Sequence, residues 1–319
     1  FGMVTATFEA STGIYYSMKI IEQQLLAEFD MENQIVEMRN LCAGFNSQFV
    51  PVLYTTYNDS TNLYMLQELV PGGDFWSILY DSDYLDTTSL GGINYLSTLF
   101  YAANILGGLT YLHENGVTYR NLKPENVVMD AKGYLKLTDF SYAKRLMGAE
   151  TSTTICGNPE YMAPEMVLSK PYNRAVDFWA FGIFLFELLT RSTPFDHSTT
   201  AGVYQRILAS NEYLYAAFNT GFDQLEYLHN VKDVIALLLN SNPSTRIGML
   251  RNGSDDVWNH VTFKDMKLES LKSGVCIAPF VPKLMSSPAP VAFAYENELD
   301  VNRILEGRPY NGNFDFNGF

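Results

Sequence analysis

The sequence predicts an α+β fold in two lobes, a small β-rich lobe and a larger helical lobe, followed by an extended C-terminal tail. At 319 residues the chain is long enough for its core to split. Strand patterns dominate up to a Pro-Gly-Gly break at 71–73, and helical patterns dominate after it. The last forty residues are rich in Pro, Asn and aromatic side chains without any period. The predicted ranges are 1–69 for the small lobe, 70–279 for the large lobe and 280–319 for the tail.

Four β-rich runs predict the strands of the small lobe. They are Val4 to Glu9, Ile14 to Ile21, Val50 to Tyr57 and Asn62 to Leu69. The first two are joined by a turn signal at Ser11-Thr12-Gly13. Between the second and third runs, Met31 to Ala43 has helical spacing, with Ile35, Met38, Leu41 and Cys42 on one side. This lobe is therefore expected to be a sheet with one helix.

Three long helices and a hairpin are predicted in the large lobe. Tyr95 to Asn115 is an apolar-periodic segment, Ala175 to Thr190 is apolar nearly all round, and Val231 to Asn240 is expected to be another helix. Val127 to Thr138 has the pattern of a hairpin with turn residues at 130–133. The polar segment Asp81 to Asn94 is expected to be a surface connection, and no function is assigned to it.

Charge and cysteine usage limit the classes of partner and compartment. Lys and Arg total 21 against 35 Asp and Glu, a net charge of −14, which argues against broad binding to a nucleic-acid backbone. The same charge favours basic partners, although a solvated acidic surface explains it equally well. The three cysteines lie far apart, which excludes a disulfide framework and favours a reducing, cytoplasmic location.

No apolar run reaches the length of a membrane span. The longest, Phe178 to Leu189, contains Glu187 and is typical of a buried helix. No signal peptide is recognisable, and the chain opens on Phe1-Gly2 without an initiator Met. We therefore expect it to be a fragment with no membrane span.

A short polar loop, Tyr119 to Asn126, carries the strongest chemical signal. It follows the long helix and precedes the hairpin whose far end is Asp139-Phe140-Ser141. Asn126 and Asp139 offer oxygen ligands of the kind that Mg²⁺ prefers, and Lys123 offers charge for a moving phosphoryl group. This order of residues predicts phosphate chemistry with a divalent cation.

The order and spacing of the motifs resemble a eukaryotic protein kinase. They include Lys19 in a strand, the polar loop, the Asp139 triplet and Ala163-Pro164-Glu165. Within that family the chain resembles the AGC group, and in it the cAMP-dependent type. The supporting segments are Asn62 to Met65, Val70 to Gly73, Cys156 to Tyr161, Pro279 to Lys283 and the final Phe316 to Phe319. The resemblance implies a bilobal kinase fold and an ATP- and Mg²⁺-dependent serine/threonine kinase.

The resemblance assigns a set of residues to the nucleotide and its metal. Lys19 would pair with the ATP phosphates. In the family a Glu on the following helix pairs with this Lys, and gapless matching places Met38 at that position, with Glu37 one residue away. Asn126 and Asp139 would hold Mg²⁺. The full set implied for ATP is Gly2, Val4, Ser17, Lys19, Glu68, Val70, Asp74, Asn126, Val128 and Asp139.

It also implies sites for substrate and for regulation. Asp74, Glu125 and Glu187 match acids that read Arg residues of a peptide, so an Arg-rich substrate or pseudosubstrate is expected. Thr154 matches an activation-loop phosphosite that would bind Arg120 and Lys144. Structural roles are implied for a Glu165–Arg246 ion pair, for Asp177 beneath the catalytic loop, for a column of Cys42, Leu53, Tyr119 and Phe140, and for Phe316 and Phe319 in an apolar pocket.

Three positions depart from the family pattern. Asn121 replaces the catalytic Asp, Ser141 replaces the Gly of the triplet, and Asn158 replaces a supporting Thr. Asn121 and Lys123 are thus the candidate catalytic residues, but an amide does not accept the proton of a substrate hydroxyl. Two hypotheses stay open. One is a kinase with impaired chemistry, and the other is an ATP-binding pseudokinase that acts as a scaffold or binds a regulatory subunit or inhibitor.

Overall fold

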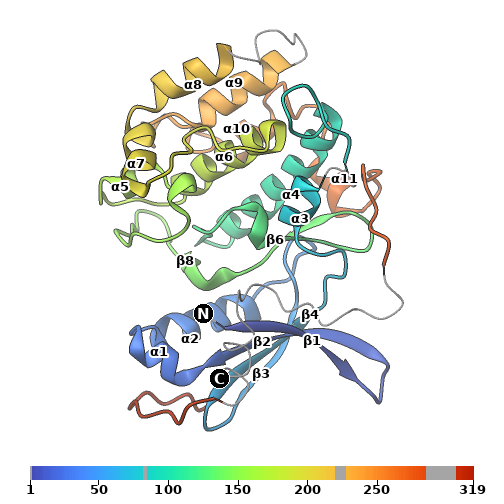
Figure 1. Cartoon of the computed structure of the whole chain (residues 1–319), viewed down its shortest axis with the longest axis vertical. Coiled ribbons are helices and arrows are strands. Elements are labelled where there is room, and N and C mark those ends of the chain that lie inside the picture. The colour runs from blue at the N-terminus through green and yellow to red at the C-terminus, as the bar shows by residue number, and fades with distance from the viewer. Residues whose placement is uncertain (1, 82–84, 220–227, 285–306) are drawn as a thin grey trace. The chain divides into compact units, whose positions relative to one another are not determined.

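The computed structural model describes residues 2–81, 85–219, 228–284 and 307–319. The chain divides into two compact units, Phe1–Gly72 with Lys283–Phe319, and Gly73–Pro282. The first is built around a β-sheet and the second is mostly helical (Figure 1). This confirms the predicted α+β fold class.

The first unit contains a four-stranded antiparallel sheet in the order β1-β2-β4-β3. All four strands predicted from β-rich runs are present. Their bounds are β1 Met3–Glu9, β2 Ile14–Glu22, β3 Leu53–Asn58 and β4 Asn62–Glu68. Two helices, α1 (Gln23–Glu28) and α2 (Glu32–Ala43), follow β2. Helix α1 is too short for a periodic signal and was not predicted.

The end of the tail packs on the first unit. Phe316 and Phe319 are buried, with exposed fractions of 5% and 6%. The guanidinium of Arg308 donates to Glu22 at 2.5 Å and to Glu28 at 2.7 Å. Apolar burial and this ion pair together hold the segment from residue 307 to the end, as the resemblance implied for its two phenylalanines.

The second unit is helical, with two short antiparallel strand pairs. Strand β5 (Val117–Thr118) pairs with β8 (Lys144–Arg145), and β6 (Val127–Met129) pairs with β7 (Leu135–Leu137). The helices are α3 Phe75–Tyr80, α4 Tyr95–Glu114, α5 Pro164–Val167, α6 Ala175–Thr190, α7 Thr200–Leu208, α8 Ser210–Asn219, α9 His229–Leu238, α10 Ser254–Trp258 and α11 Leu268–Lys272. The predicted hairpin and the three long helices are all present. No helix in the described part of the chain combines the length and apolar character needed to cross a bilayer.

Helix α6 is the centre of the second unit. Its residues from Ala175 to Leu189 are all buried, and it packs against α4 and α9 (Figure 1). Beside it, Arg246 makes a bidentate ion pair with Glu165, with N–O distances of 2.8 and 3.0 Å. Both side chains are buried, so the pair expected from the sequence is part of the core.

The segment that leads into α4 docks on the C-terminal end of α6. The backbone N–H of Gly92 donates to the carbonyl of Leu189 at 3.1 Å, and that of Ile93 donates to Leu188 at 2.8 Å. The last carbonyls of a helix have no partner within the helix, so these bonds cap α6. The segment was expected to be a surface connection. Its second half is instead an integral part of this helix end.

Gly92 lies too close to α6 to carry a side chain. A Cβ built there would lie 2.1 Å from the carbonyl carbon of Leu189. That carbon is a backbone atom, so it has no side-chain rotation by which to move away. We expect Gly92→Ala to destabilise the protein by about 1–3 kcal/mol or more, the usual cost of overpacking a core. The urea midpoint measures this. Gly44→Ala is the control, because its Cβ would meet its nearest atom at an ordinary 3.5 Å. Equal midpoints for the two variants would contradict the argument.

Candidate active site

In the first unit, three residues assigned to the nucleotide share one face of the sheet. Val4 is paired with Lys19 across β1 and β2, and Lys19 is two residues from Ser17. Paired residues and residues two apart lie on the same face of a sheet. The side chains of Val4, Ser17 and Lys19 therefore form one row. Glu68 ends β4, just before Val70.

Gly2 approaches the neighbouring strand closely. Its φ is 126°, and a Cβ at this position would lie 2.6 Å from the carbonyl oxygen of Ile20. Only glycine adopts this backbone conformation without strain. The position therefore requires glycine for a structural reason, whatever its part in phosphate binding.

In helix α2 the two residues considered at the position of the acidic partner of Lys19, Glu37 and Met38, differ in burial. Met38 is buried in the core of the helix face, whereas Glu37 is exposed. Adjacent helix positions are turned by about 100°, so the two side chains point in different directions. Met38 thus has a packing role, and Glu37 is the acidic residue that remains at this place in α2.

In the second unit, Asp177 anchors the start of the polar loop Tyr119 to Asn126, which the resemblance identifies as the catalytic loop. Its carboxylate accepts backbone hydrogen bonds from Tyr119 and Arg120, both at 2.8 Å. Asp177 is fully buried in α6 and also contacts the His113 ring at 2.7 Å. These contacts fix the backbone that leads into Arg120, whose φ is 62°. The expected link between loop and helix is present.

Asn121 is directed at the metal-ligand position. Its amide nitrogen donates to the backbone carbonyl of Asp139 and to the Oδ2 atom of the same residue, each at 3.0 Å. The amide of Asn126 donates to the backbone carbonyl of Asn121 at 2.8 Å. The structure therefore brings together three of the four residues assigned to catalysis and metal binding, namely Asn121, Asn126 and Asp139.

Ser141 reaches the other oxygen of the same carboxylate. Its hydroxyl donates to Asp139 Oδ1 at 2.5 Å. Asp139 itself adopts a left-handed conformation, with φ 48° and ψ 77°. Sequence analysis noted Ser141 only as the loss of a glycine. The contact depends on the turn after Asp139, which the spacing of residues does not reveal.

Asn126 and Asp139 fit a Mg²⁺ site of the kind completed by substrate phosphates. The amide nitrogen of Asn126 donates to the Asn121 carbonyl, so its amide oxygen is the atom that would bind a cation. Across residues 2–81, 85–219, 228–284 and 307–319, no three His, Cys, Asp or Glu side chains are grouped as a metal cage. Mg²⁺ commonly uses one or two protein oxygens plus phosphates and waters, which suits this pair.

Glu187 is a buried carboxylate with an unsatisfied oxygen. It is only 4% exposed, and its Oε1 accepts from the Tyr80 hydroxyl at 2.6 Å. Its Oε2 has no hydrogen-bond partner within the described residues. Burial, together with the charges of Glu125 and Glu160 and against the effect of the Tyr80 hydrogen bond, raises the pKa of Glu187 to about 7. Such a carboxylate gains strongly from a cationic partner.

Two other acids lie near functional positions. Glu125 contacts the Lys123 ammonium at 3.6 Å. Asp74 caps helix α3, because its carboxylate accepts from the backbone N–H and the hydroxyl of Ser77, both at 2.8 Å. Asp74 also forms an isolated β-bridge with Val128, so two residues assigned to the nucleotide are neighbours.

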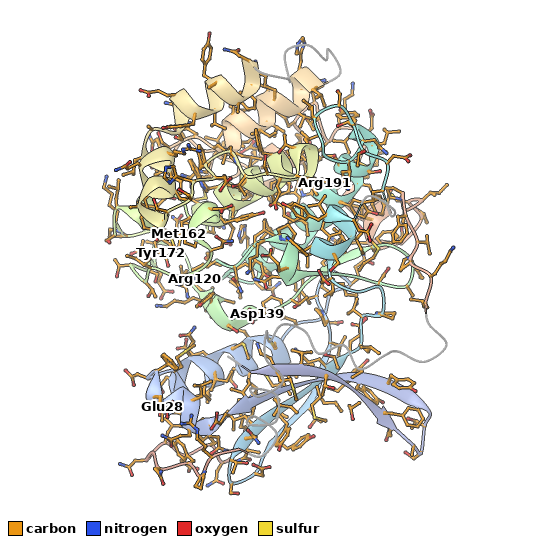
Figure 2. The ribbon with its side chains drawn as sticks, viewed as in Figure 1. Glu28, Arg120, Asp139, Met162, Tyr172 and Arg191 are labelled. Carbon is orange, nitrogen blue, oxygen red and sulfur yellow. The ribbon has the colours of Figure 1, made fainter. Side chains whose placement is uncertain are left out.

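The activation segment is tied to Arg120 through neutral side chains. Arg120 donates to the hydroxyls of Tyr172 at 2.8 Å and Ser152 at 3.3 Å, and Tyr172 donates to the carbonyl of Thr154 at 2.6 Å. Arg120 and Tyr172 lie close together in Figure 2. The Thr154 side chain is exposed, and Lys144 lies in β8. A phosphate on Thr154 would therefore join a network already centred on Arg120.

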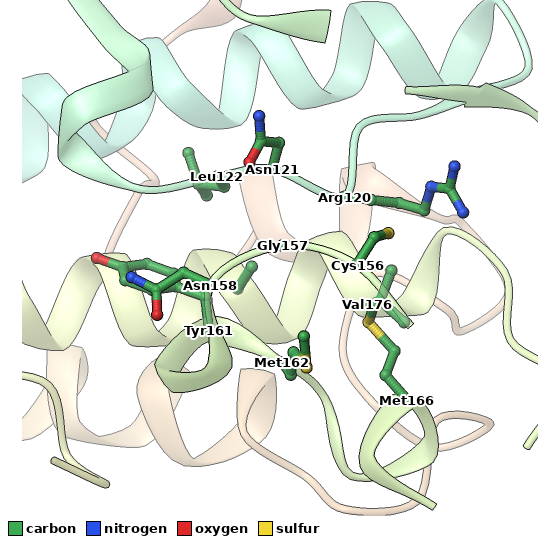
Figure 3. A pocket seen from close by; sticks show the side chains of 11 residues that line it. Arg120, Asn121, Leu122, Cys156, Gly157, Asn158, Tyr161, Met162, Met166 and Val176 are labelled. Atoms are coloured by element: carbon green, nitrogen blue, oxygen red, sulfur yellow. The ribbon is translucent and has the colours of Figure 1, made fainter. Parts of the chain in front are cut away.

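A small pocket separates the catalytic loop from the segment Cys156–Asn158. Gly157 crosses beneath the loop, and a Cβ there would lie 2.9 Å from the Arg120 carbonyl (Figure 3). Asn158 stands where the family has a supporting Thr. Its side chain accepts from the backbone N–H of Glu160 at 3.1 Å and so caps the turn at Pro159–Tyr161. Figure 3 shows the Asn121 side chain pointing away from it.

Comparison with known proteins agrees with this geometry. The family pattern described as the protein kinase domain matches residues 1–260. The chain belongs to the protein kinase family. It is 34% identical over 284 residues to the cAMP-dependent protein kinase catalytic subunit of Dictyostelium discoideum. The matched region covers 89% of this chain and 41% of that protein.

Two further relatives place this kinase in the expected group. The cAMP-dependent protein kinase catalytic subunit PRKX of Homo sapiens is 34% identical over 285 residues, covering 89% of this chain and 74% of that protein. The cAMP-dependent protein kinase type 3 of Saccharomyces cerevisiae is 31% identical over 313 residues, covering 97% of this chain and 74% of that protein. The resemblance to AGC serine/threonine kinases is confirmed.

Sequence reasoning missed several polar residues of this kinase. Tyr80 and Glu160 act on Glu187, and Ser152 and Tyr172 act on Arg120. The motif Cys156 to Tyr161 contains Glu160, so its acidic side chain could have been added to the substrate-binding acids. No sequence signal marks the other three, because their roles depend on contacts between segments distant along the chain.

Proposed function

We propose that this chain binds ATP with Mg²⁺ and transfers the γ-phosphoryl group, slowly, to Ser or Thr of Arg-rich proteins. The observation that carries the proposal is the convergence of Asn121, Asn126 and Asp139, with Lys123 in the same loop. These are the residue types that phosphoryl transfer uses to position and neutralise its groups.

Each of these residues has a separate role in the proposed reaction. Lys19 pairs with phosphates, while Asn126 and Asp139 hold Mg²⁺, which supplies positive charge to the transferring group. Lys123 offers a second cation near the same loop. Asn121 orients the attacking hydroxyl but does not accept its proton, so general-base catalysis, typically worth about 10²–10⁴ in rate, is lost. The remaining rate comes from positioning and charge.

Burial of Glu187 supports an Arg-rich substrate. An unsatisfied carboxylate oxygen in an apolar helix is costly until a donor reaches it. A guanidinium offers five N–H donors in a fork that matches a carboxylate. Glu125 and Glu160 contribute further negative charge to Glu187's surroundings. The Arg preference follows from this chemistry.

A second candidate function is a nucleotide-binding scaffold without turnover. The hydrogen bond from Asn121 to Asp139 favours it, because the amide acts as a donor at the position where the family has its base. Such a protein would bind an Arg-rich partner as a pseudosubstrate, and a regulatory subunit or inhibitor is a suitable class of partner. Phosphate transfer to a peptide distinguishes the two functions.

Nucleotide binding is the first test. ATP with Mg²⁺ is expected to raise the melting temperature, because a ligand that binds the native state stabilises it by mass action. Lys19→Met is expected to reduce the shift, and AMP, which lacks the β- and γ-phosphates, serves as the ligand control. If ATP at millimolar concentration gives no shift, nucleotide binding is refuted and so is the kinase proposal.

A further inference from the structure

We infer that Asn121 and Ser141 act together as a two-donor clamp on the Asp139 carboxylate, which makes nucleotide binding by this chain nearly independent of Mg²⁺. The inference rests on the proposed function, since it concerns how the same site holds ATP. It assigns a joint role to the two residues that depart most from the family pattern.

The two donors reach different oxygens of one carboxylate. Asn121 Nδ2 donates to Oδ2 at 3.0 Å, and Ser141 Oγ donates to Oδ1 at 2.5 Å. They approach from separate segments, the catalytic loop and the turn after Asp139. A family Asp at 121 and a family Gly at 141 would provide neither donor. The two departures therefore have one shared structural result.

These hydrogen bonds act on the carboxylate in two ways. They place the positive ends of N–H and O–H dipoles on its oxygens, which partly offsets its negative charge toward a triphosphate. They also engage lone pairs and fix the carboxylate orientation that a cation would otherwise choose. Both effects lower the gain from Mg²⁺. The backbone bond from Asn121 to the Asp139 carbonyl holds the arrangement in place.

Metal affinity is sensitive to such contacts. Hydrogen-bond partners of metal ligands commonly change metal affinity by about 10–100-fold when altered. Asn121→Asp replaces the amide donor with a second negative charge next to Asp139, which demands a cation. Ser141→Ala removes the other donor without adding the backbone freedom of glycine. Both variants are therefore expected to restore dependence on Mg²⁺.

Isothermal titration with ATP, in excess EDTA and in excess MgCl₂, tests the inference. For the unaltered chain we expect the two dissociation constants to agree within about threefold, and for Asn121→Asp with Ser141→Ala to differ by roughly tenfold or more. Each single variant should lie between. Ser11→Ala is the matched control, because its hydroxyl donates to the exposed Glu9 carboxylate at 3.2 Å. It should behave as the unaltered chain does.

A second readout follows the metal itself. Electron paramagnetic resonance of Mn²⁺, titrated in the presence of ATP, should show tighter binding to the double variant than to the unaltered chain by about tenfold. ATP binding that requires Mg²⁺ in the unaltered chain, or Mn²⁺ affinity that is equal in both proteins, overturns the clamp while the proposed function stands. Absence of ATP binding in both buffers overturns both. A melting curve for each variant confirms that it is folded.

Discussion

Asn121→Asp is expected to raise kcat for an Arg-rich peptide by about two to four orders of magnitude, with little change in KM for ATP. The added carboxylate accepts the proton of the attacking hydroxyl, which becomes acidic only as the new bond to phosphorus forms. An interaction made only in the transition state changes kcat rather than ground-state binding. The substitution also removes the amide donor from Asp139 Oδ2.

The assay needs protein phosphorylated at Thr154, so that a poorly ordered activation segment is not mistaken for a missing base. Asn115→Asp is the matched control, since Asn115 ends helix α4 and its amide donates to the Tyr111 carbonyl, outside the candidate site. Its kcat should equal that of the unaltered chain. An Asn121→Asp protein that binds ATP but stays inactive would favour the scaffold function. A high kcat for the unaltered chain would show that catalysis does not need a general base at position 121.

Loss of Glu125 and Glu187 together is expected to weaken binding of an Arg-rich peptide by about 2–5 kcal/mol. That range corresponds to roughly 30-fold to several-thousand-fold in affinity. The double Ala variant removes one carboxylate that is buried and one that contacts Lys123. Fluorescence anisotropy with a labelled peptide measures the change, and the same peptide with its Arg residues replaced by Ala is the control. Unchanged affinity would assign both acids a purely structural role.

The same site is expected to respond to pH. Burial raises the pKa of Glu187 to about 7, so the group is mostly neutral below that value and ionised above it. Only the ionised form attracts a guanidinium, so peptide affinity should increase as pH rises through about 7. Glu187→Gln should abolish this dependence and keep the Tyr80 contact. A flat profile in the unaltered protein would place the ionisation of Glu187 elsewhere.

Most of the regular fold follows from local patterns. The four strands of the sheet were predicted from β-rich runs, and the helices α2, α4, α6 and α9 from helical spacing or, for α6, from a surface that is apolar nearly all round. Short helices such as α1 and α3 were not predicted, since one or two helical turns contain too few apolar positions to show a period. The docking of Gly92 and Ile93 on α6 is a contact between distant backbones and has no local pattern.

The motifs of the chain determine its family, and with it the identity of most candidate residues. The resemblance carried by those motifs is enough to name Lys19, Asn126 and Asp139 as residues for the nucleotide and its metal. The same reasoning identifies Asn121 and Ser141 as substitutions. It treats them as two separate losses.

Only the tertiary structure shows what those two residues do. Both donate to one carboxylate, because the turn after Asp139 and the loop anchored by Asp177 bring them to opposite oxygens. The burial of Glu187, the contact from Tyr80 and the exposure of Glu37 are likewise decided by packing. Hydrogen bonds and desolvation act over a few ångströms in space. Sequence order determines which groups the chain possesses, and the fold determines which of them meet.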